Sequence, residues 1–277
     1  MISRIRNSPR RILLVRNISN FFYIFQDFLI LLNILITHMG KHSHIANKPL
    51  KIVTASDTSH FLSVVQLINS IKKYDNNSEI VFYDLGLKKN EFDILKKMQI
   101  KIIQFPFQNF PNFMNLSEKD AGAYAWKPQI IISEISKDNM LTLWLDAGDL
   151  VNKNLNLVRL LLHKKGFYSP LSNGYVGQWT HGDTLEALSI KNKIKNKRML
   201  NAAIIGINPS NKKIKSYIKT WSEYAMDKKI ILPEGSGKNN HRWDQSLLTV
   251  LYYKNIKRIK FPKTHKIFGI LTHQDVE

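Results

Sequence analysis

Two carboxylates that follow an apolar segment are the residues best suited to chemistry. Asp146 comes directly after residues 141–145 (LTLWL), and Asp149 follows three residues later, with Gly148 relaxing the turn. Two oxygen donors this close suit Mg²⁺ or Mn²⁺, which typically takes one or two carboxylates together with water and substrate phosphates. Such a cation would stabilise the charge that develops on a departing diphosphate. In the structural alternative, Asp149 caps the next segment and Asp146 accepts backbone hydrogen bonds.

The elements that must position these carboxylates alternate between two apolar patterns. Short β-branched or wholly apolar runs predict strands at residues 51–55, 80–83, 100–105 and 141–145. Apolar residues at helical spacing predict helices at 61–73, 91–98 and 124–135. This alternation predicts an α/β fold with a doubly wound, mostly parallel sheet. In such a sheet the ligand site lies beyond the carboxyl ends of the strands, where Asp57, Asp84 and Asp146 fall.

Composition and missing motifs exclude several classes of protein. The 277 residues contain no cysteine, which excludes disulfides, thiolate nucleophiles, Cys-ligated zinc and iron–sulfur clusters. The sequence lacks GxGxxG and GxxxxGKS/T motifs, which argues against dinucleotide oxidoreductases and P-loop enzymes, and it also lacks GxSxG and HExxH. An apolar fraction of 44% is too high for a disordered chain.

The chain is strongly basic, with 41 Lys and Arg against 21 Asp and Glu and a net charge of +20. Such a field favours a phosphate-bearing substrate, an anionic membrane surface or nucleic acid as a partner. The basic residues form no single long run, and the sequence has no zinc-finger or RNA-binding signature. Nucleic acid is therefore the least favoured of the three partners.

Residues 1–48 form a segment that differs from the remainder, which we expect to be one domain at residues 49–277. An arginine-rich flank at residues 4–16 precedes an almost wholly apolar run at residues 21–36. The run is shorter than the ~20 residues needed to cross a bilayer, and polar residues interrupt it on roughly one side of a helix. These polar residues are Gln26, Asp27 and Asn33.

A helix that lies in the membrane interface, with its arginines on anionic headgroups, fits this pattern. The alternatives are an accessory helix packed on the core domain and a single-pass signal anchor whose basic flank keeps the N-terminus cytoplasmic. We therefore expect a cytoplasmic protein that contacts the cytoplasmic face of a membrane.

Five motifs in a fixed order carry a resemblance to a known family. They are YAWKP at 124–128, LWLDAGD at 143–149, QWTH at 178–181, NAAIIG at 201–206 and HRWDQSLL at 241–248. In this order the sequence resembles glycosyltransferases of the Rossmann-like GT-A fold, the nucleotide-diphospho-sugar transferases, over about residues 51–273. It is most similar to a domain of unknown function in that superfamily, and more distantly similar to glycogenin-type family 8 enzymes.

The resemblance implies transfer of a sugar from a nucleotide-diphosphate sugar to a hydroxyl of a glycan or lipid-linked acceptor, in glycan or surface polysaccharide synthesis. It also implies a site for Mn²⁺ or Mg²⁺. Asp146 matches the first aspartate of a DxD metal motif, whereas Gly148 stands where the second would be. Asp149 would substitute for that aspartate, or metal dependence is reduced or lost. His265 or His273 would complete the metal shell.

The resemblance places the donor around the first strand and the helix after the third. Thr54, Ala55 and Asp57 match the residues that hold the nucleoside. Lys127 matches a basic residue beside the donor diphosphate, where its point charge would serve a phosphate; the structural alternative is a surface lysine at a helix start. His181 lies in a polar loop, where it would contact either ligand or solvent.

Residues further along the chain would contact the sugar and the acceptor. Asn201 and Ala202 match the segment that lines the donor sugar. Asp244 and Gln245 match a pair that hydrogen-bonds sugar or acceptor hydroxyls, although Asp244 could instead cap a helix. The catalytic base would be Asp244 or Asp183, between which the spacing does not choose. The alternative function is a non-catalytic nucleotide-sugar or glycan-binding protein on the same fold, because the metal motif is broken.

Overall fold

The structure is a computed structural model that describes residues 48–117, 120–256 and 265–276. The positions before residue 48 that it describes are Phe25, Phe28, Leu29, Leu32, Ile36, His44 and Ile45. The arginine-rich flank predicted at residues 4–16 lies outside the described residues. Within the described part of the chain, no helix combines the length and the apolar character needed to cross a bilayer.

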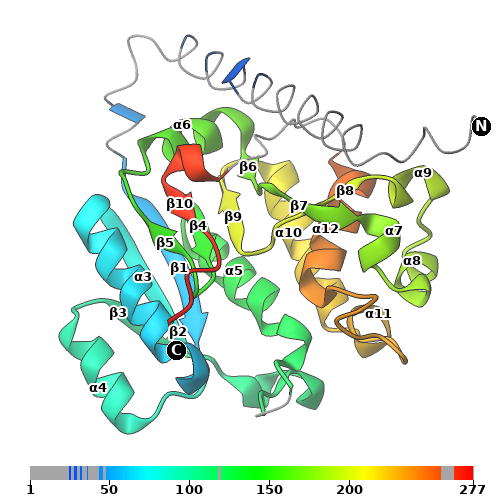
Figure 1. The fold of residues 1–277 in the computed structure, drawn as a ribbon, viewed down its shortest axis with the longest axis horizontal. Helices are drawn as coiled ribbons and strands as arrows, with labels where there is room; N and C mark the ends of the chain where they lie inside the picture. Colours follow the sequence, from blue (N-terminus) through cyan, green and yellow to red (C-terminus); the bar gives the residue numbers. More distant parts are fainter. Residues whose placement is uncertain are drawn as a thin grey trace, which may run out of the picture.

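A six-stranded sheet runs through the centre of the molecule in the order β3-β2-β1-β4-β9-β6 (Figure 1). Its strands are β1 (Leu50–Ser56), β2 (Ser78–Asp84), β3 (Lys101–Gln104), β4 (Leu141–Leu145), β6 (Phe167–Tyr168) and β9 (Ile204–Ile207). The first four strands along the chain are parallel, whereas β9 is antiparallel to both of its neighbours. The predicted α/β fold with a mostly parallel sheet is thus confirmed, with one reversed strand.

The helices that follow the first three strands begin and end within two residues of their predicted bounds. They are α3 (Phe61–Tyr74), α4 (Lys89–Lys97) and α5 (Trp126–Lys137). The later helices are α6 (Asn156–Lys165), α7 (Val176–Trp179), α8 (Gly182–Ala187), α9 (Asn192–Lys195), α10 (Lys212–Ala225), α11 (Lys228–Ile231) and α12 (Trp243–Asn255). Strands β7 (Leu171–Tyr175) and β8 (Arg198–Leu200) form a separate antiparallel pair.

Helices cover both faces of the sheet. On one face lie α3 and α6, joined by an ion pair of 2.7 Å between Arg159 of α6 and Asp75, which ends α3. On the other face lies α5, with α10 packed on it and α12 packed on α10. Because both faces are covered, β1 and β4 are buried along their whole lengths, which explains their continuous rather than alternating apolar pattern.

A small sheet brings a distant segment of the chain back to the turn after β4. Strand β10 (Ile270–Leu271) pairs antiparallel with β5 (Leu150–Val151). Beyond β10, the backbone N–H of Gln274 donates to the carbonyl of Gly148 at 2.7 Å. The N–H of Val276 donates to Ser63 Oγ of α3 at 3.0 Å. Residues after β10 therefore lie between α3 and the turn after β4.

Candidate functional site

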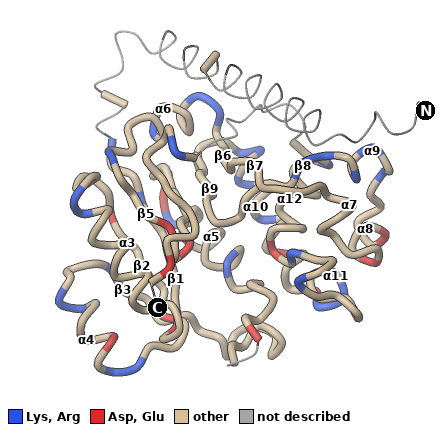
Figure 2. Tube along the Cα trace, in the orientation of Figure 1, with Lys and Arg blue, Asp and Glu red and all other residues tan. Residues whose placement is uncertain are grey.

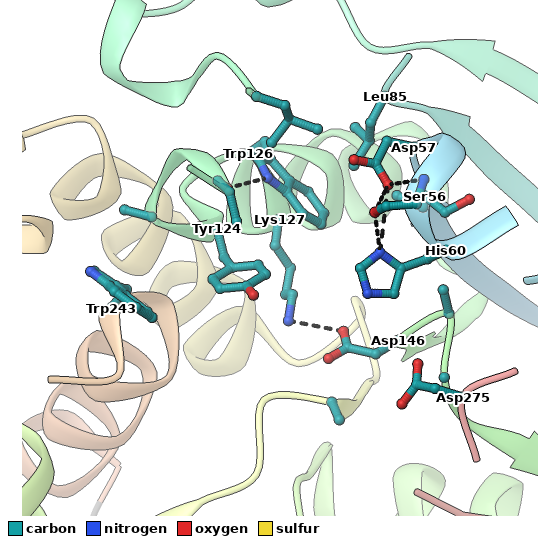
Figure 3. Close-up of a pocket in the computed structure, with 18 of the residues that line it drawn as sticks. Ser56, Asp57, His60, Leu85, Tyr124, Trp126, Lys127, Asp146, Trp243 and Asp275 are labelled. Carbon is teal, nitrogen blue, oxygen red and sulfur yellow. Dashed lines mark hydrogen bonds and ion pairs between the residues drawn. The ribbon is translucent and has the colours of Figure 1, made fainter. Parts of the chain in front are cut away.

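A cavity of about 550 Å³ opens at the carboxyl ends of β1 and β4 (Figure 3). Its walls come from the turn after β1, the segment that leads into α5, the turn after β4 and the segment after β10. The titratable residues that line it include Asp57, His60, Asp120, Lys127, Asp146, Asp149, Lys238, His273 and Asp275. The cavity therefore lies at the edge of the sheet where the sequence predicts a ligand site.

Lys127 is held between two carboxylates at the start of α5. Its Nζ lies 2.9 Å from Asp146 Oδ1 and 3.3 Å from Asp244 Oδ2, and only 5% of its side chain is exposed. It also donates to the carbonyl of Ala202 at 3.4 Å. Burial by itself lowers the pKa of Lys127, but the two carboxylates outweigh burial and raise it. Lys127 is thus a fixed cation in the cavity wall, and the alternative of a surface lysine is wrong.

The Asp146 carboxylate is hydrogen-bonded to the protein on one side and exposed to the cavity on the other. Its Oδ1 accepts hydrogen bonds from Lys127 and from Trp144 Nε1, the latter at 2.6 Å. The Trp144 ring packs against Trp126, with centroids 6.1 Å apart, so the donor that orients this carboxylate is itself fixed. The Asp146 side chain is 39% exposed and points into the cavity (Figure 3). It is therefore both oriented and accessible to a ligand.

Asp149 lies below Asp146 and is almost completely buried, with 2% exposure. Its Oδ2 accepts from the N–H of Asp146 at 3.2 Å, and its own N–H donates to the Asp146 carbonyl at 3.0 Å. Burial, followed by the nearby Asp146 carboxylate, raises the pKa of Asp149 well above its ordinary value. The turn differs from the structural alternative, because Asp149 rather than Asp146 accepts a backbone hydrogen bond with its carboxylate. Its burial leaves the Asp149 carboxylate much less accessible to a cation than that of Asp146.

Asp244 lies in the first turn of α12, whose N-cap is Arg242. It is 4% exposed, does not line the cavity, and reaches it only through its contact with Lys127. Burial raises its pKa to about 6, although Lys127 opposes the shift. Asp244 is therefore placed to hold Lys127 rather than to touch a ligand.

The turn after β1 supplies an acidic and basic pair on the opposite wall. Asp57 Oδ1 accepts from Ser59 Oγ at 2.6 Å and lies 3.5 Å from His60 Nδ1. The hydrogen bond with His60, more than those with Ser59, lowers the pKa of Asp57 to about 2. Asp57 raises the pKa of His60 in return, and the carboxylates of Asp275 and Asp146 add to that rise. The His60 ring therefore faces the acidic side of the cavity, where Asp146 and Asp275 lie (Figure 3).

Two hydroxyl groups near the end of β1, Thr54 Oγ1 and Ser56 Oγ, have no hydrogen-bond partner among the described residues. Both residues are buried, and Ser56 lines the cavity together with Ala55 and Asp57. A buried hydroxyl without a partner is costly unless water or a ligand satisfies it. Of the two, only Ser56 has a hydroxyl at the cavity, where the resemblance puts the nucleoside, because Thr54 does not line it.

Several predicted residues do not line the cavity: Thr54, His181, Asp183, Asn201, Ala202, Gln245 and His265. The Asn201 side chain accepts a backbone N–H in the turn before β9. His181 Nδ1 accepts from the N–H of Asp183 at the start of α8, and the Asp183 carboxylate is 66% exposed. His265 contacts Thr272 rather than the cavity, whereas its alternative, His273, lines it.

His60 and Asp275 line the cavity beside Asp146 but were not among the residues predicted from the sequence (Figure 3). His60 has a local signal, because it follows Asp57 by three residues in a polar turn directly after a predicted strand. Asp275 has none, because the pairing of β10 with β5 brings it to the site.

The donor groups suit a divalent cation that also binds a phosphate. Among the described residues, no three His, Asp or Glu side chains converge to form a complete metal site. Mg²⁺ and Mn²⁺ do not require one, since one or two carboxylates suffice when phosphates and water complete the shell. The cavity lining contains five aspartates against two lysines and two histidines, and a divalent cation would offset part of the repulsion between these carboxylates and an anionic diphosphate.

Sequence comparisons give a family of unknown function. The model of one protein family, described as a protein of unknown function (DUF1647), matches residues 29–132. This agrees with the expected resemblance. No curated protein matches the sequence.

Several solved structures to which the chain is similar are glycosyltransferases. The bifunctional glycosyltransferase WbbM, in its apo structure, is 15% identical with a TM-score of 0.51, and the match covers 75% of this chain and 38% of that one. The galactosyltransferase LgtC, solved with donor and acceptor sugar analogs, is 16% identical with a TM-score of 0.47, covering 73% and 70%. Mouse xyloside xylosyltransferase 1 is 6% identical with a TM-score of 0.46, covering 77% and 83%. The chain has the GT-A glycosyltransferase fold, as its sequence motifs implied.

Proposed function

We propose that the protein is a glycosyltransferase that moves a sugar from a nucleotide-diphosphate sugar to a hydroxyl of a glycan or lipid-linked acceptor, in glycan or surface polysaccharide synthesis. The observation that carries the proposal is that Asp146 and Lys127 form an ion pair in the wall of the cavity, with Asp244 holding Lys127 from behind it. Its volume of about 550 Å³ falls within the ~300–1,000 Å³ typical of ligand pockets.

Each residue of this arrangement has a task in such a transfer. The leaving nucleoside diphosphate gains negative charge, which the fixed ammonium group of Lys127 would stabilise without moving. Asp146 would hold Mn²⁺ or Mg²⁺, which when bound neutralises the phosphates and lets them enter an acidic cavity. Asp244 would act as a positioning residue, because its carboxylate contacts Lys127 and not the cavity.

A donor screen tests this proposal. The purified protein is incubated with a panel of UDP- and GDP-sugars, and release of the nucleoside diphosphate is measured with Mn²⁺ and with EDTA. We expect release from at least one donor with Mn²⁺, and none from the Asp146→Ala variant under conditions where circular dichroism shows that it is folded. Unchanged turnover in that variant would reject this site.

The alternative is a binding protein on the same fold, without catalysis. The observation that favours it is Gly148, which breaks the expected metal motif, together with the burial of Asp149. Calorimetry with the same donors separates the two functions. Binding without any diphosphate release would support the binding protein, whereas metal-dependent binding followed by release supports the enzyme.

We also propose an anionic membrane surface as a partner, on the cytoplasmic face. Five apolar side chains near the start of the chain are helical and between 39% and 56% exposed. They are Phe25, Phe28, Leu29, Leu32 and Ile36. Residues 1–50 contain seven Lys and Arg and one Asp, which complements anionic headgroups. In the domain itself, Lys and Arg are spread over many elements rather than gathered in one block (Figure 2).

Vesicle sedimentation tests this partner. We expect the protein to pellet with vesicles that contain phosphatidylserine and to stay in solution with phosphatidylcholine alone. Replacing Phe28 and Leu32 with serine should abolish pelleting without changing diphosphate release. If the variant pelleted as much as the wild type, these exposed apolar side chains would be excluded as the contact.

A further inference from the structure

Gly148 is a glycine because of a close approach and not because of its backbone conformation. Its φ lies outside the left-handed region that favours glycine. A Cβ atom at this position would lie 2.2 Å from Asp275 Oδ1 and 2.6 Å from Asp275 Cγ, closer than the 3.0 Å below which something must shift. The carboxyl group of Asp275 therefore fills the space that a side chain at position 148 would take.

The segment that carries Asp275 is anchored on both sides of this residue. On one side, the Gln274 N–H donates to the Gly148 carbonyl at 2.7 Å. On the other side, Val276 N–H donates to Ser63 Oγ at 3.0 Å, and that hydroxyl lies 3.3 Å from the Val276 carbonyl. The backbone that carries this carboxylate is thus held against the turn after β4 and against α3.

Asp275 and Asp146 face the same part of the cavity. Figure 3 shows the two carboxylates on neighbouring sides of the space in front of His60. Asp146 is accessible, and Asp275 lines the cavity beside it. Asp149, the other acidic residue of the turn, is buried beneath them and hydrogen-bonded to the backbone.

We propose that Asp275 is the second carboxylate of the cation site, supplied from after β10 in place of a side chain at position 148. Gly148 and Asp275 then form a matched pair, in which the glycine makes room for a carboxylate from elsewhere in the chain. The cation would be a hard divalent ion, Mn²⁺ or Mg²⁺, with Asp146 as the other protein ligand. The binding of the cation by these two carboxylates does not depend on the proposed function. Only the diphosphate that would share the cation rests on it.

Binding of Mn²⁺ alone, followed by electron paramagnetic resonance, tests the pair without any donor. The Asp275→Asn variant keeps the shape of the side chain and loses its charge. We expect its affinity for Mn²⁺ to fall by about tenfold or more, since even the outer partners of metal ligands are worth about 10–100-fold. The Gly148→Asp/Asp275→Gly variant, which moves the carboxylate back to position 148, should recover most of the affinity.

Asp120→Asn is the matched control, because it removes a carboxylate from the same cavity while its side-chain oxygen can still accept from Gly122 N–H. The affinity of this variant for Mn²⁺ should stay within about twofold of the wild type, because Asp120 is not one of the two proposed ligands. Wild-type affinity in Asp275→Asn would overturn the proposal, and so would a folded relocation variant that does not recover binding. If the wild type releases diphosphate in EDTA and binds no Mn²⁺, this inference fails while the transferase function stands.

Discussion

Two buried lysines lie at opposite ends of α5, and each faces two carboxylates. Lys51 of β1 lies 2.6 Å from Asp138 and 3.5 Å from Glu134, near the end of the helix. Lys127, in its first turn, lies 2.9 Å and 3.3 Å from the carboxylates of Asp146 and Asp244. By residue type and burial alone the two clusters look alike.

Their charge balance and surroundings differ. In the Lys51 cluster, Glu134 also pairs with Lys137 and accepts from Tyr83 Oη at 2.6 Å, so two ammonium groups face two carboxylates. Within the described residues, the carboxylates around Lys127 have no second ammonium partner, and a cavity adjoins them. Burial of the lysine therefore does not distinguish the two clusters, whereas the charge balance and the adjoining cavity do.

Replacing Lys127 with methionine should have the largest effect on function. We expect diphosphate release to fall about 10²–10³-fold, the usual cost of removing one preorganised donor from a developing anion. The unfolding free energy should change less than it does when Lys51 is replaced, because Asp244 can take up a proton once Lys127 is gone. A variant that releases diphosphate at the wild-type rate would remove Lys127 from the mechanism.

Replacing Lys51 with methionine should instead affect stability. Removing one partner of a buried ion pair costs about 3–5 kcal/mol, and we expect the lower end because Lys137 still pairs with Glu134. Urea unfolding measures this loss, and the rate of diphosphate release per folded molecule should stay unchanged. If the Lys51→Met variant kept its stability but lost diphosphate release, the division into a structural Lys51 and a functional Lys127 would be wrong.

The two clusters should also respond to pH with opposite signs. The pKa of Asp244 is raised from 3.8 to about 6, so its contribution to stability is full below pH 4 and is lost as the pH rises through 6. That loss is of the order of 2–3 kcal/mol. Salt bridges and hydrogen bonds lower the pKa of Glu134 against the effect of burial, so its contribution is lost as the pH falls.

Unfolding curves between pH 4 and pH 7 measure the difference. The Asp244→Asn variant should lose part of the wild-type decline in stability on going from pH 4 to pH 6. The Glu134→Gln variant should instead lose part of the decline in stability that the wild type shows as the pH falls. Parallel profiles for wild type and Asp244→Asn would contradict the burial of an ionisable carboxyl beside Lys127.

The smallest effect is expected for Gly148→Ala. The added Cβ would displace the Asp275 carboxylate, and because this is the end of an exposed side chain that can move, we expect a cost of no more than about 0.5 kcal/mol. Removing that carboxylate in Gly148→Ala/Asp275→Ala should restore the melting temperature. Gly182→Ala is the control, because nothing lies within 4 Å of a Cβ there.

Much of the fold could be predicted because the strands of a covered parallel sheet are short, apolar and bounded by polar turns. The pattern LTLWL gives β4 its bounds without error, and the first helix differs by one residue at its end. The reversed strand β9 was not predicted, because its direction depends on which neighbours it pairs with. Periodicity carries no information about strand direction.

The site could be predicted only in part, for a similar reason. Asp57, Lys127 and Asp146 line the cavity because they sit at the ends of local elements whose positions the sequence indicates. Asp149 has the spacing of a metal ligand, but its depth of burial is a property of the packed turn. Asp275 reaches the site through the pairing of β10 with β5, which no local pattern specifies.

The most direct test compares two variants that each remove one carboxylate from a buried lysine, Asp146→Asn and Asp138→Asn. Nucleoside diphosphate release is measured for both with Mn²⁺ and the donor found in the screen. We predict at least about a 100-fold loss for Asp146→Asn, on the scale of a lost electrostatic contact in an active site, and no more than about twofold for Asp138→Asn. Equal rates in the two variants would contradict a donor site at the ends of β1 and β4.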